Sequence, residues 1–209
     1  MSTPDSIPGV LPDGQIANPA RPGLRVELLR KAGAQCGVQV RFSLAPWARA
    51  LGLVKAGRVE GAFSTSYSEE RSVYGVFPQA NGKLDPSRAM KGYTYSLYVH
   101  PESTLGWDGK AVSGTERQVI VERGSAASEI AIRLGLDPIE VPGYRNMVLM
   151  LAAKRAEGMI GIDTYIDKAL EADATLDGRI RALSPPLAAK HGFVMFSRAF
   201  YAQHTELAE

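Results

Sequence analysis

The sequence is poor in the residues that mark disulfide-linked and nucleic-acid-binding proteins. Cys36 is the only cysteine among 209 residues, so no disulfide can form within the chain. Lysine and arginine number 24 against 22 acidic residues, the formal net charge is only +2, and no dense basic block occurs. Binding of nucleic acid through its phosphates is therefore not indicated, and we expect no nucleic-acid partner.

Long apolar runs are also missing. No stretch approaches the roughly 20 consecutive apolar residues that a membrane-spanning helix needs. The first ten residues, MSTPDSIPGV, have neither the basic start nor the apolar centre of a secretory signal peptide. The sequence therefore indicates either a cytoplasmic protein or an exported protein whose signal peptide is not present in this chain.

Motifs for metal binding and for several kinds of catalysis are absent as well. The three histidines, His100, His191 and His204, lie far apart without the spacing of metal ligands. There is no Gly-Lys-Ser/Thr phosphate loop and no dinucleotide-binding glycine pattern. Neither Ser64 nor Ser125 has an obvious histidine to activate it as a nucleophile. We expect no metal, no cofactor and no enzymatic activity.

What the chain does contain is ordinary globular composition, with 45% apolar and 22% charged residues. Its first part predicts a helix over 24–35, a strand over 38–44, a helix from Pro46 and a strand from Val59. Strand–helix–strand spacing implies parallel pairing through a right-handed crossover. In the first helix, apolar residues recur every fourth position and predict its buried face: Leu24, Leu28, Ala32 and Cys36.

A second series of strands and helices follows. Strands are predicted at 93–99, 119–121, 139–141, 159–162, 179–183 and 193–196, and helices at 126–134, 144–156, 164–172 and from Ser197 onward. The strand at 93–99 and the return near 184–196 are expected to cross between two lobes, which makes a hinge and a cleft. Lobe 1 would comprise residues 1–92 and 189–209, and lobe 2 residues 93–188.

One stretch, residues 59–78, carries the strongest indication of a binding site. It reads VEGAFSTSYSEERSVYGVFP, an apolar run that ends in hydroxyl side chains. Ser68 is placed to cap a helical turn, and Arg71 follows three residues later with a planar fork of donors that matches a carboxylate. Open α/β sheets bind ligands where such strands end. The alternative is a solvated loop with a solvated arginine.

With these residues in place, the chain resembles the type 2 periplasmic solute-binding proteins of family 3, the amino-acid-type binding components of ABC importers. Four segments carry the resemblance by their order and spacing: PGLRVELLRKAGAQCGVQVRF, PWARALGLVKAGRVEGAFSTSYSEERSVYGVFP, VERGSAASEI and MLAAKRAEGMIGID. It extends from about Gly23 to the end. It implies an α/β, two-lobe periplasmic-binding-protein-like (type 2) fold with a hinge and an interlobe cleft.

The resemblance also implies roles for individual residues of the first lobe. Arg71 stands where the family's arginine grips the α-carboxylate of the ligand, and Ser64 and Ser66 fall where hydroxyl or backbone groups meet it. Trp47 and Tyr67 could supply aromatic walls. For Trp47, a position in the core is the alternative.

In the second lobe, the family donates backbone N–H groups to the same carboxylate from a turn at a helix start. Here that turn is Gly124, Ser125 and Ala126. Asp163 stands where an aspartate takes the ammonium group of the ligand, and its alternative role is the N-cap of the following helix.

The function implied is an extracytoplasmic, periplasmic protein that captures an amino acid or related carboxylate for the membrane subunits of an ABC importer. Two other classes remain open. A dehydratase on the same fold would need a carboxyl group as acid or base, and Glu69, Glu70 and Glu122 are the nearest. A sensor module would pass the signal of ligand closure to a partner.

The chain departs from the family at both ends. Its first residues offer neither the family's first strand nor the aromatic segment that follows it, and the family usually continues beyond the helix near Ser197. We therefore expect a chain trimmed or divergent at both termini. A first lobe without its first strand could leave a strand edge open to another chain.

Overall fold

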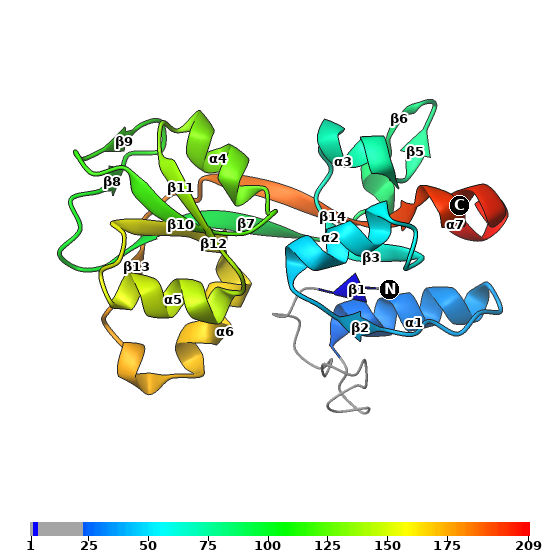
Figure 1. Cartoon of the computed structure of the whole chain (residues 1–209), viewed down its shortest axis with the longest axis horizontal. Helices are drawn as coiled ribbons and strands as arrows, with labels where there is room; N and C mark the ends of the chain where they lie inside the picture. Colours follow the sequence, from blue (N-terminus) through cyan, green and yellow to red (C-terminus); the bar gives the residue numbers. More distant parts are fainter. Residues whose placement is uncertain (1, 4–22) are drawn as a thin grey trace. The chain divides into compact units, whose positions relative to one another are not determined.

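The computed structural model describes residues 2, 3 and 23–209. The chain divides into two compact units, unit 1 (Met1–Gly92 with His191–Glu209) and unit 2 (Tyr93–Lys190). It enters unit 2 within strand β7 (Met90–Val99) and returns within strand β14 (Ala188–Ser197) (Figure 1). None of the helices in the described ranges combines the length and apolar character needed to cross a bilayer.

Unit 1 is built on a sheet in the order β14-β3-β1-β2, with β4 on the far side of β14. The strands are β1 (Ser2–Thr3), β2 (Ser43–Leu44), β3 (Gly61–Thr65) and β4 (Gly75–Val76), with a separate hairpin of β5 (Gln79–Ala80) and β6 (Lys83–Leu84). β1 runs parallel to both β2 and β3, and β14 runs antiparallel to β3. The helices are α1 (Leu24–Gln35), α2 (Trp47–Lys55), α3 (Glu69–Tyr74), α7 (Arg198–Gln203) and α8 (Thr205–Ala208), and a 3₁₀ turn spans Pro86–Arg88.

Helix α1 has the predicted bounds, but the predicted buried face is wrong. Leu24 and Leu28 are 67% and 47% exposed and Cys36 is exposed, whereas Val26 and Leu29 are buried. A strict four-residue repeat drifts around the helix by about 40° per step, because 3.6 residues complete a turn. Residues that alternate between spacings of three and four, as the buried residues do, stay on one face of the helix.

The N-terminal strand is a second departure from expectation, since no strand was predicted before Leu24. β1 has two residues, which is too short to leave an alternating pattern in the sequence. It pairs Ser2 with Ser43 on one side and with Ala62 on the other. The strand predicted over 38–44 is correspondingly reduced to Ser43–Leu44. Residues in an extended conformation form a strand only where a neighbouring strand pairs with them. β1 pairs with this segment only at Ser43 and Leu44.

Unit 2 is built on a sheet in the order β11-β10-β12-β7, with β13 also paired to β7. The strands are β10 (Gln118–Glu122), β11 (Asp137–Val141), β12 (Gly158–Ile162) and β13 (Arg181–Ala182), with a hairpin of β8 (Gly106–Trp107) and β9 (Val112–Ser113). β10 is parallel to β11 and β12, and β12 is antiparallel to β7. The helices are α4 (Ala127–Arg133), α5 (Tyr144–Ala152) and α6 (Asp163–Glu171), with a 3₁₀ turn at Ala174–Leu176.

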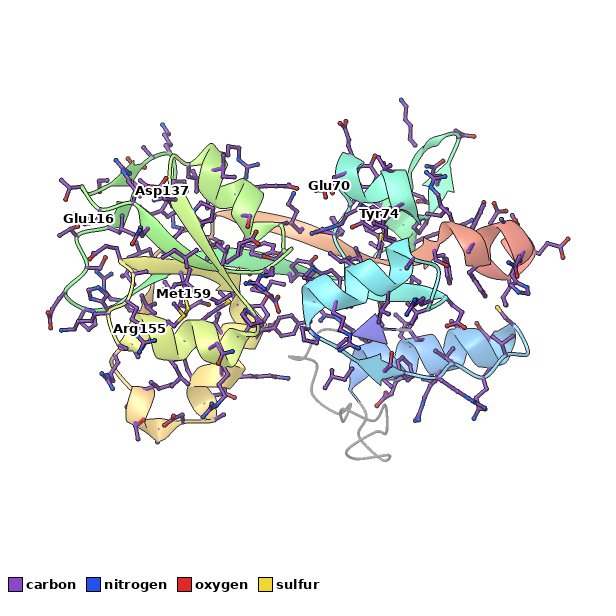
Figure 2. All side chains as sticks on the ribbon, in the orientation of Figure 1. Glu70, Tyr74, Glu116, Asp137, Arg155 and Met159 are labelled. Atoms are coloured by element: carbon purple, nitrogen blue, oxygen red, sulfur yellow. The ribbon has the colours of Figure 1, made fainter. Side chains whose placement is uncertain are left out.

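The central strands of unit 2 are apolar on both faces because helices cover both. In Figure 1, α5 and α6 lie on one side of β10 and β12, and α4 lies on the other. Ile120 and Met159 are 0% exposed, and Figure 2 labels Met159 in β12. A Cβ added to Gly161 would lie 2.9 Å from Cδ1 of Ile166 and 3.3 Å from Cε1 of Tyr144, so α5 and α6 pack against β12 with no space for a side chain there.

This packing predicts that Gly161→Ala lowers the free energy of unfolding by about 1–3 kcal/mol, because the methyl group overpacks the interface with α6. Gly52 is the matched control: it lies inside α2, and a Cβ added there meets nothing within 4 Å. Gly52→Ala should raise the free energy of unfolding by about 0.5–1 kcal/mol. Urea denaturation measures both, and equal effects of the two substitutions would contradict the packing described for Gly161.

Candidate functional site

In unit 1 the polar residues of interest follow a bulge at the end of β3. Thr65 pairs with Phe193 and Ala62 with Met195, so three steps along β3 oppose two along β14. Ser64, inside this bulge, has a φ of 59°, a left-handed conformation that costs a residue with a side chain about 1–2 kcal/mol. Such bulges redirect the chain and are frequent beside functional sites. Here the bulge turns the hydroxyl run away from the regular sheet.

Arg71 is held by that run. Its guanidinium Nη1 donates to Oγ of Ser66 at 2.7 Å and to the carbonyl oxygen of Ser66 at 2.9 Å. The backbone N–H of Arg71 donates to Oγ of Ser68 at 3.3 Å, so Ser68 caps α3 as predicted. Arg71 is only 5% exposed. The solvated-arginine alternative is therefore wrong: the guanidinium is buried and fixed in orientation.

Other residues of α3, the helix that contains Arg71, lie close to it in the sequence. Glu70 and Tyr74, labelled in Figure 2, are four residues apart on α3 and therefore on the same face of the helix. Burial raises the pKa of Tyr74, and the neighbouring positive charge of Arg71 partly opposes that increase. Tyr74 also shares a side-chain hydrogen bond with Arg71. Glu69 and Glu70 are exposed, which does not suit the desolvated acid or base of the dehydratase alternative.

The two aromatic candidates of unit 1 have different environments. Trp47 is 7% exposed at the start of α2, in a cluster of buried residues that includes Phe77 and Phe193. Its core alternative is therefore the better interpretation. Tyr67 is 37% exposed, and its ring meets that of Phe77 edge-on at 5.3 Å between centroids. Tyr67 thus presents part of its ring to solvent beside the hydroxyl run.

In unit 2, Asp163 begins α6 directly after the buried strand β12. Thr94 donates from Oγ1 to one carboxylate oxygen of Asp163, and the Tyr98 hydroxyl donates to the other at 3.3 Å. The N-cap of α6 is Ile162, and no side chain caps the helix, so the alternative role of Asp163 as N-cap is wrong. Its carboxylate instead connects to β7.

Asp163 makes its surroundings acidic. Burial and then the negative charge of Asp163 raise the pKa of Tyr98. Burial and then the same charge raise the pKa of Asp167, one helical turn further along α6. Both effects have the sign expected where negative charge accumulates without full compensation.

A second carboxylate, Glu122, lies at the same edge of this sheet. It ends β10, which runs parallel to β12 with Val121 opposite Ile160. Glu122 is 5% exposed and shares a side-chain hydrogen bond with Tyr144. Burial and then the charge of Glu122 raise the pKa of Tyr144, which therefore remains a neutral donor.

The turn Gly124, Ser125 and Ala126 was predicted to donate N–H groups to the ligand, but some of its polar groups already form hydrogen bonds within the turn. The N–H of Ser125 donates to the carbonyl oxygen of Glu122 at 3.0 Å, and Oγ of Ser125 accepts from the N–H of Ala127 at 3.2 Å. Gly124 has a φ of 72°, which glycine adopts at little cost. Ala126 is buried. The Ser125 N–H is thus engaged within the turn, contrary to its predicted role as a ligand donor.

Sequence reasoning missed Thr94, Tyr98 and Tyr144 altogether. Their signal was present: Thr94 and Tyr98 lie in the tyrosine-rich strand YTYSLYV, and Tyr144 follows the end of β11. Strand formers of this kind are usually interpreted as packing residues. Across the described ranges, no three His, Cys, Asp or Glu side chains gather as a potential metal site.

The contacts of Asp163 yield a stability prediction. Thr94→Val removes the hydroxyl that donates to a charged carboxylate and should lower the free energy of unfolding by about 1.5–3 kcal/mol. Thr94→Ser retains that hydroxyl and should cost less than about 1 kcal/mol. Urea denaturation of the two variants provides the comparison. A larger loss for Thr94→Ser than for Thr94→Val would mean that the methyl group, and not the hydrogen bond, matters at this position.

Comparison with known proteins supports the fold. No protein-family model matches the chain, and no curated protein sequence matches it. Solved structures do match. A histidine kinase sensor domain with similarity to periplasmic binding proteins superposes with a TM-score of 0.74 at 18% identity, over 99% of this chain and 87% of the other.

Two further structures are similar over 99% of this chain. One is holo ArgBP from T. maritima, with a TM-score of 0.70 at 11% identity over 85% of its own chain. The other is a putative L-cystine ABC transporter protein from Listeria monocytogenes, with a TM-score of 0.72 at 14% identity over 85% of its chain. The predicted resemblance is confirmed at the level of fold: the chain has the periplasmic-binding-protein-like (type 2) architecture.

Proposed function

We propose that the protein binds a small polar solute, an amino acid or a related carboxylate, and does not transform it. The observation that carries the proposal is the buried, oriented guanidinium of Arg71. A buried cation is costly unless anionic or hydrogen-bonding groups compensate it, and a ligand carboxylate fits its planar fork in two-point geometry. The fold supports this reading, since similar structures include an arginine-bound and a glutamate-bound protein.

In unit 1, Arg71 is the proposed contact of a carboxylate group. Arg71 is already immobilised by Ser66, so little side-chain entropy remains to be lost when a ligand binds. Ser64 and Ser66 would add hydroxyl or backbone contacts. Tyr67, with its partly exposed ring, would pack on the apolar part of the ligand.

In unit 2, Asp163 is the proposed contact of an ammonium group. Asp163 is oriented by two neutral donors, Thr94 and Tyr98, which hold its carboxylate without neutralising its charge. Glu122 adds a second negative group at the same sheet edge. The Gly124–Ser125–Ala126 turn is also proposed to contact the ligand, through groups other than the Ser125 N–H.

Import by an ABC system in the periplasm is the finer form of this proposal, and the similarity to the cystine transporter protein supports it. A specific observation favours a second candidate: the structural similarity to a histidine kinase sensor domain, with a TM-score of 0.74. In that case, the protein would signal the binding of its solute to a kinase and would not deliver the solute to a transporter. The two candidate functions, import and sensing, share the binding of the solute. They differ only in the partner protein that recognises the ligand-bound form.

A ligand that binds only the folded protein must raise its unfolding midpoint by mass action. We therefore expect one member of a panel of amino acids and small carboxylates to raise the midpoint in a thermal-shift assay. Arg71→Ala should weaken binding of that compound by about 2–4 kcal/mol in calorimetry, because a desolvated charge loses its partner. Arg71→Lys should recover only part of the affinity, since an ammonium lacks the planar fork.

Arg30→Ala, at an exposed position on α1, is the matched control and should bind as the wild type does. Unchanged affinity in Arg71→Ala would overturn the assignment of the carboxylate contact. An NMR spectrum of the bound compound that remains constant over hours agrees with binding without catalysis. Conversion of the compound would instead establish the dehydratase alternative.

A further inference from the structure

Unit 2 contains a basic hollow that the proposed solute site does not use. Its volume is about 310 Å³. Three cationic residues line it, Lys110 from the β8–β9 hairpin, Arg117 from the start of β10 and Arg133 from the end of α4 (Figure 1). The other lining residues come from the same three segments and are small or apolar. The hollow therefore gathers positive charge from three separate parts of the chain.

The hollow lies at the opposite end of β10 from the candidate solute site. Arg117 directly precedes β10, whereas Glu122 ends it. Five residues of extended chain span roughly 16 Å. Asp163 follows β12, which is parallel to β10, and therefore lies at the same edge of the sheet as Glu122. A ligand in the hollow would be a second ligand and not part of the solute.

Two of the three cationic segments are held in place by hydrogen bonds. Oδ1 of Asp108 accepts from the backbone N–H groups of Lys110 and Ala111, each at 2.8 Å. The bonds from Ala111 and Lys110 lower the pKa of Asp108, whose carboxylate is thus engaged by the turn itself. Nη1 of Arg117, a half-buried residue, donates to the carbonyl oxygen of Val112 at 3.1 Å. That bond orients the guanidinium and leaves its other N–H donors for a ligand.

The third segment, the end of α4, leaves space in the hollow. The N–H of Leu136 donates to the carbonyl oxygen of Ala131 at 3.0 Å, and Gly135 has a φ of 69°, so the chain turns directly after the helix. A Cβ added to Gly135 would meet nothing within 4 Å. A cation in the last turn of a helix also compensates the helix dipole. That role accounts for Arg133 alone, because Lys110 comes from another segment.

The three positive charges are not neutralised by direct contact within the described ranges of the chain. Glu116 precedes Arg117, and the N–H of Asp137 donates to the carbonyl oxygen of Arg117 at 2.9 Å; both acidic residues are labelled in Figure 2. Neither of them lines the hollow, and the ion pairs of these ranges do not include Lys110, Arg117 or Arg133. Lys110 and Arg133 are exposed, so a ligand can reach them.

We propose that this hollow binds a phosphate monoester, a group that carries close to two negative charges at neutral pH. The planar fork of Arg117 matches two phosphate oxygens, and Arg133 and Lys110 contribute further donors. Three cations around one hollow favour a dianion over a singly charged carboxylate, because each adds its own attraction. A soluble phosphorylated molecule and the headgroup of an anionic lipid both provide this chemistry.

Calorimetric titration of the full chain with glycerol 3-phosphate tests the proposal, and we expect saturable binding. Arg133→Gln and Lys110→Gln should each weaken that binding about tenfold, the loss expected for one hydrogen bond to a charged group. Arg155→Gln is the matched control and should leave the affinity unchanged. Arg155, labelled in Figure 2, is an exposed arginine of unit 2 that does not line the hollow.

A second control separates the hollow from the proposed carboxylate contact of unit 1. Arg71 is a cation that offers the ester another place to bind. Arg71→Ala should therefore retain the affinity for glycerol 3-phosphate if the hollow is the site. Loss of binding in Arg71→Ala, without loss in Arg133→Gln, would overturn the proposal.

The charge of the ligand provides an independent readout. A phosphate monoester loses one of its two charges as the pH falls through about 6, and no histidine lines the hollow. The titratable groups beside the hollow are Asp108, Glu116 and Asp137. The affinity for glycerol 3-phosphate should fall about fivefold or more between about pH 7.5 and pH 5.5, whereas that for methyl sulfate, a constant monoanion, should not change. Equal pH dependence of the two ligands would contradict recognition of a dianion.

Vesicles distinguish the two sources of the phosphate group. Binding of glycerol 3-phosphate without cosedimentation on phosphatidylcholine vesicles that contain phosphatidic acid supports a soluble ligand. Cosedimentation that is lost in Arg133→Gln supports a lipid headgroup. The proposal is overturned if neither the ester nor the vesicles bind. It is also overturned if the peptide acetyl-Glu-Glu-Glu-amide binds more tightly than the ester, which would assign the hollow to an acidic segment of a partner protein.

Discussion

Parallel strands constrain where this chain can place its polar groups. β3, β10 and β12 each pair in parallel with a neighbour, and crossovers join them, so the chain leaves the sheet at their carboxyl ends. Their interiors are buried on both faces and have no place for a charge. Arg71, Glu122 and Asp163 accordingly lie at or just after those ends. The chemistry of each unit follows from the sheet before any ligand is considered.

The contacts described above for Arg71 and Asp163 are made by neutral groups. Ser66 orients the guanidinium of Arg71, and Thr94 and Tyr98 orient the carboxylate of Asp163. Such partners satisfy hydrogen-bonding capacity and fix geometry, but they leave most of the charge in place. Each unit therefore holds one charged group in a fixed orientation, Arg71 in unit 1 and Asp163 in unit 2.

Much of this could be predicted from sequence, and the failures have physical causes. The bounds of α1, the cap at Ser68 and the position of Asp163 after a buried strand depend on local patterns, which a sequence contains. The buried face of α1 was predicted wrongly because a strict repeat of four residues drifts around the helix, whereas the buried residues Val26, Leu29 and Gly33 follow spacings of three and four. The tyrosines around the carboxylates could not be predicted, since their role depends on hydrogen bonds between residues as far apart as Tyr98 and Asp163.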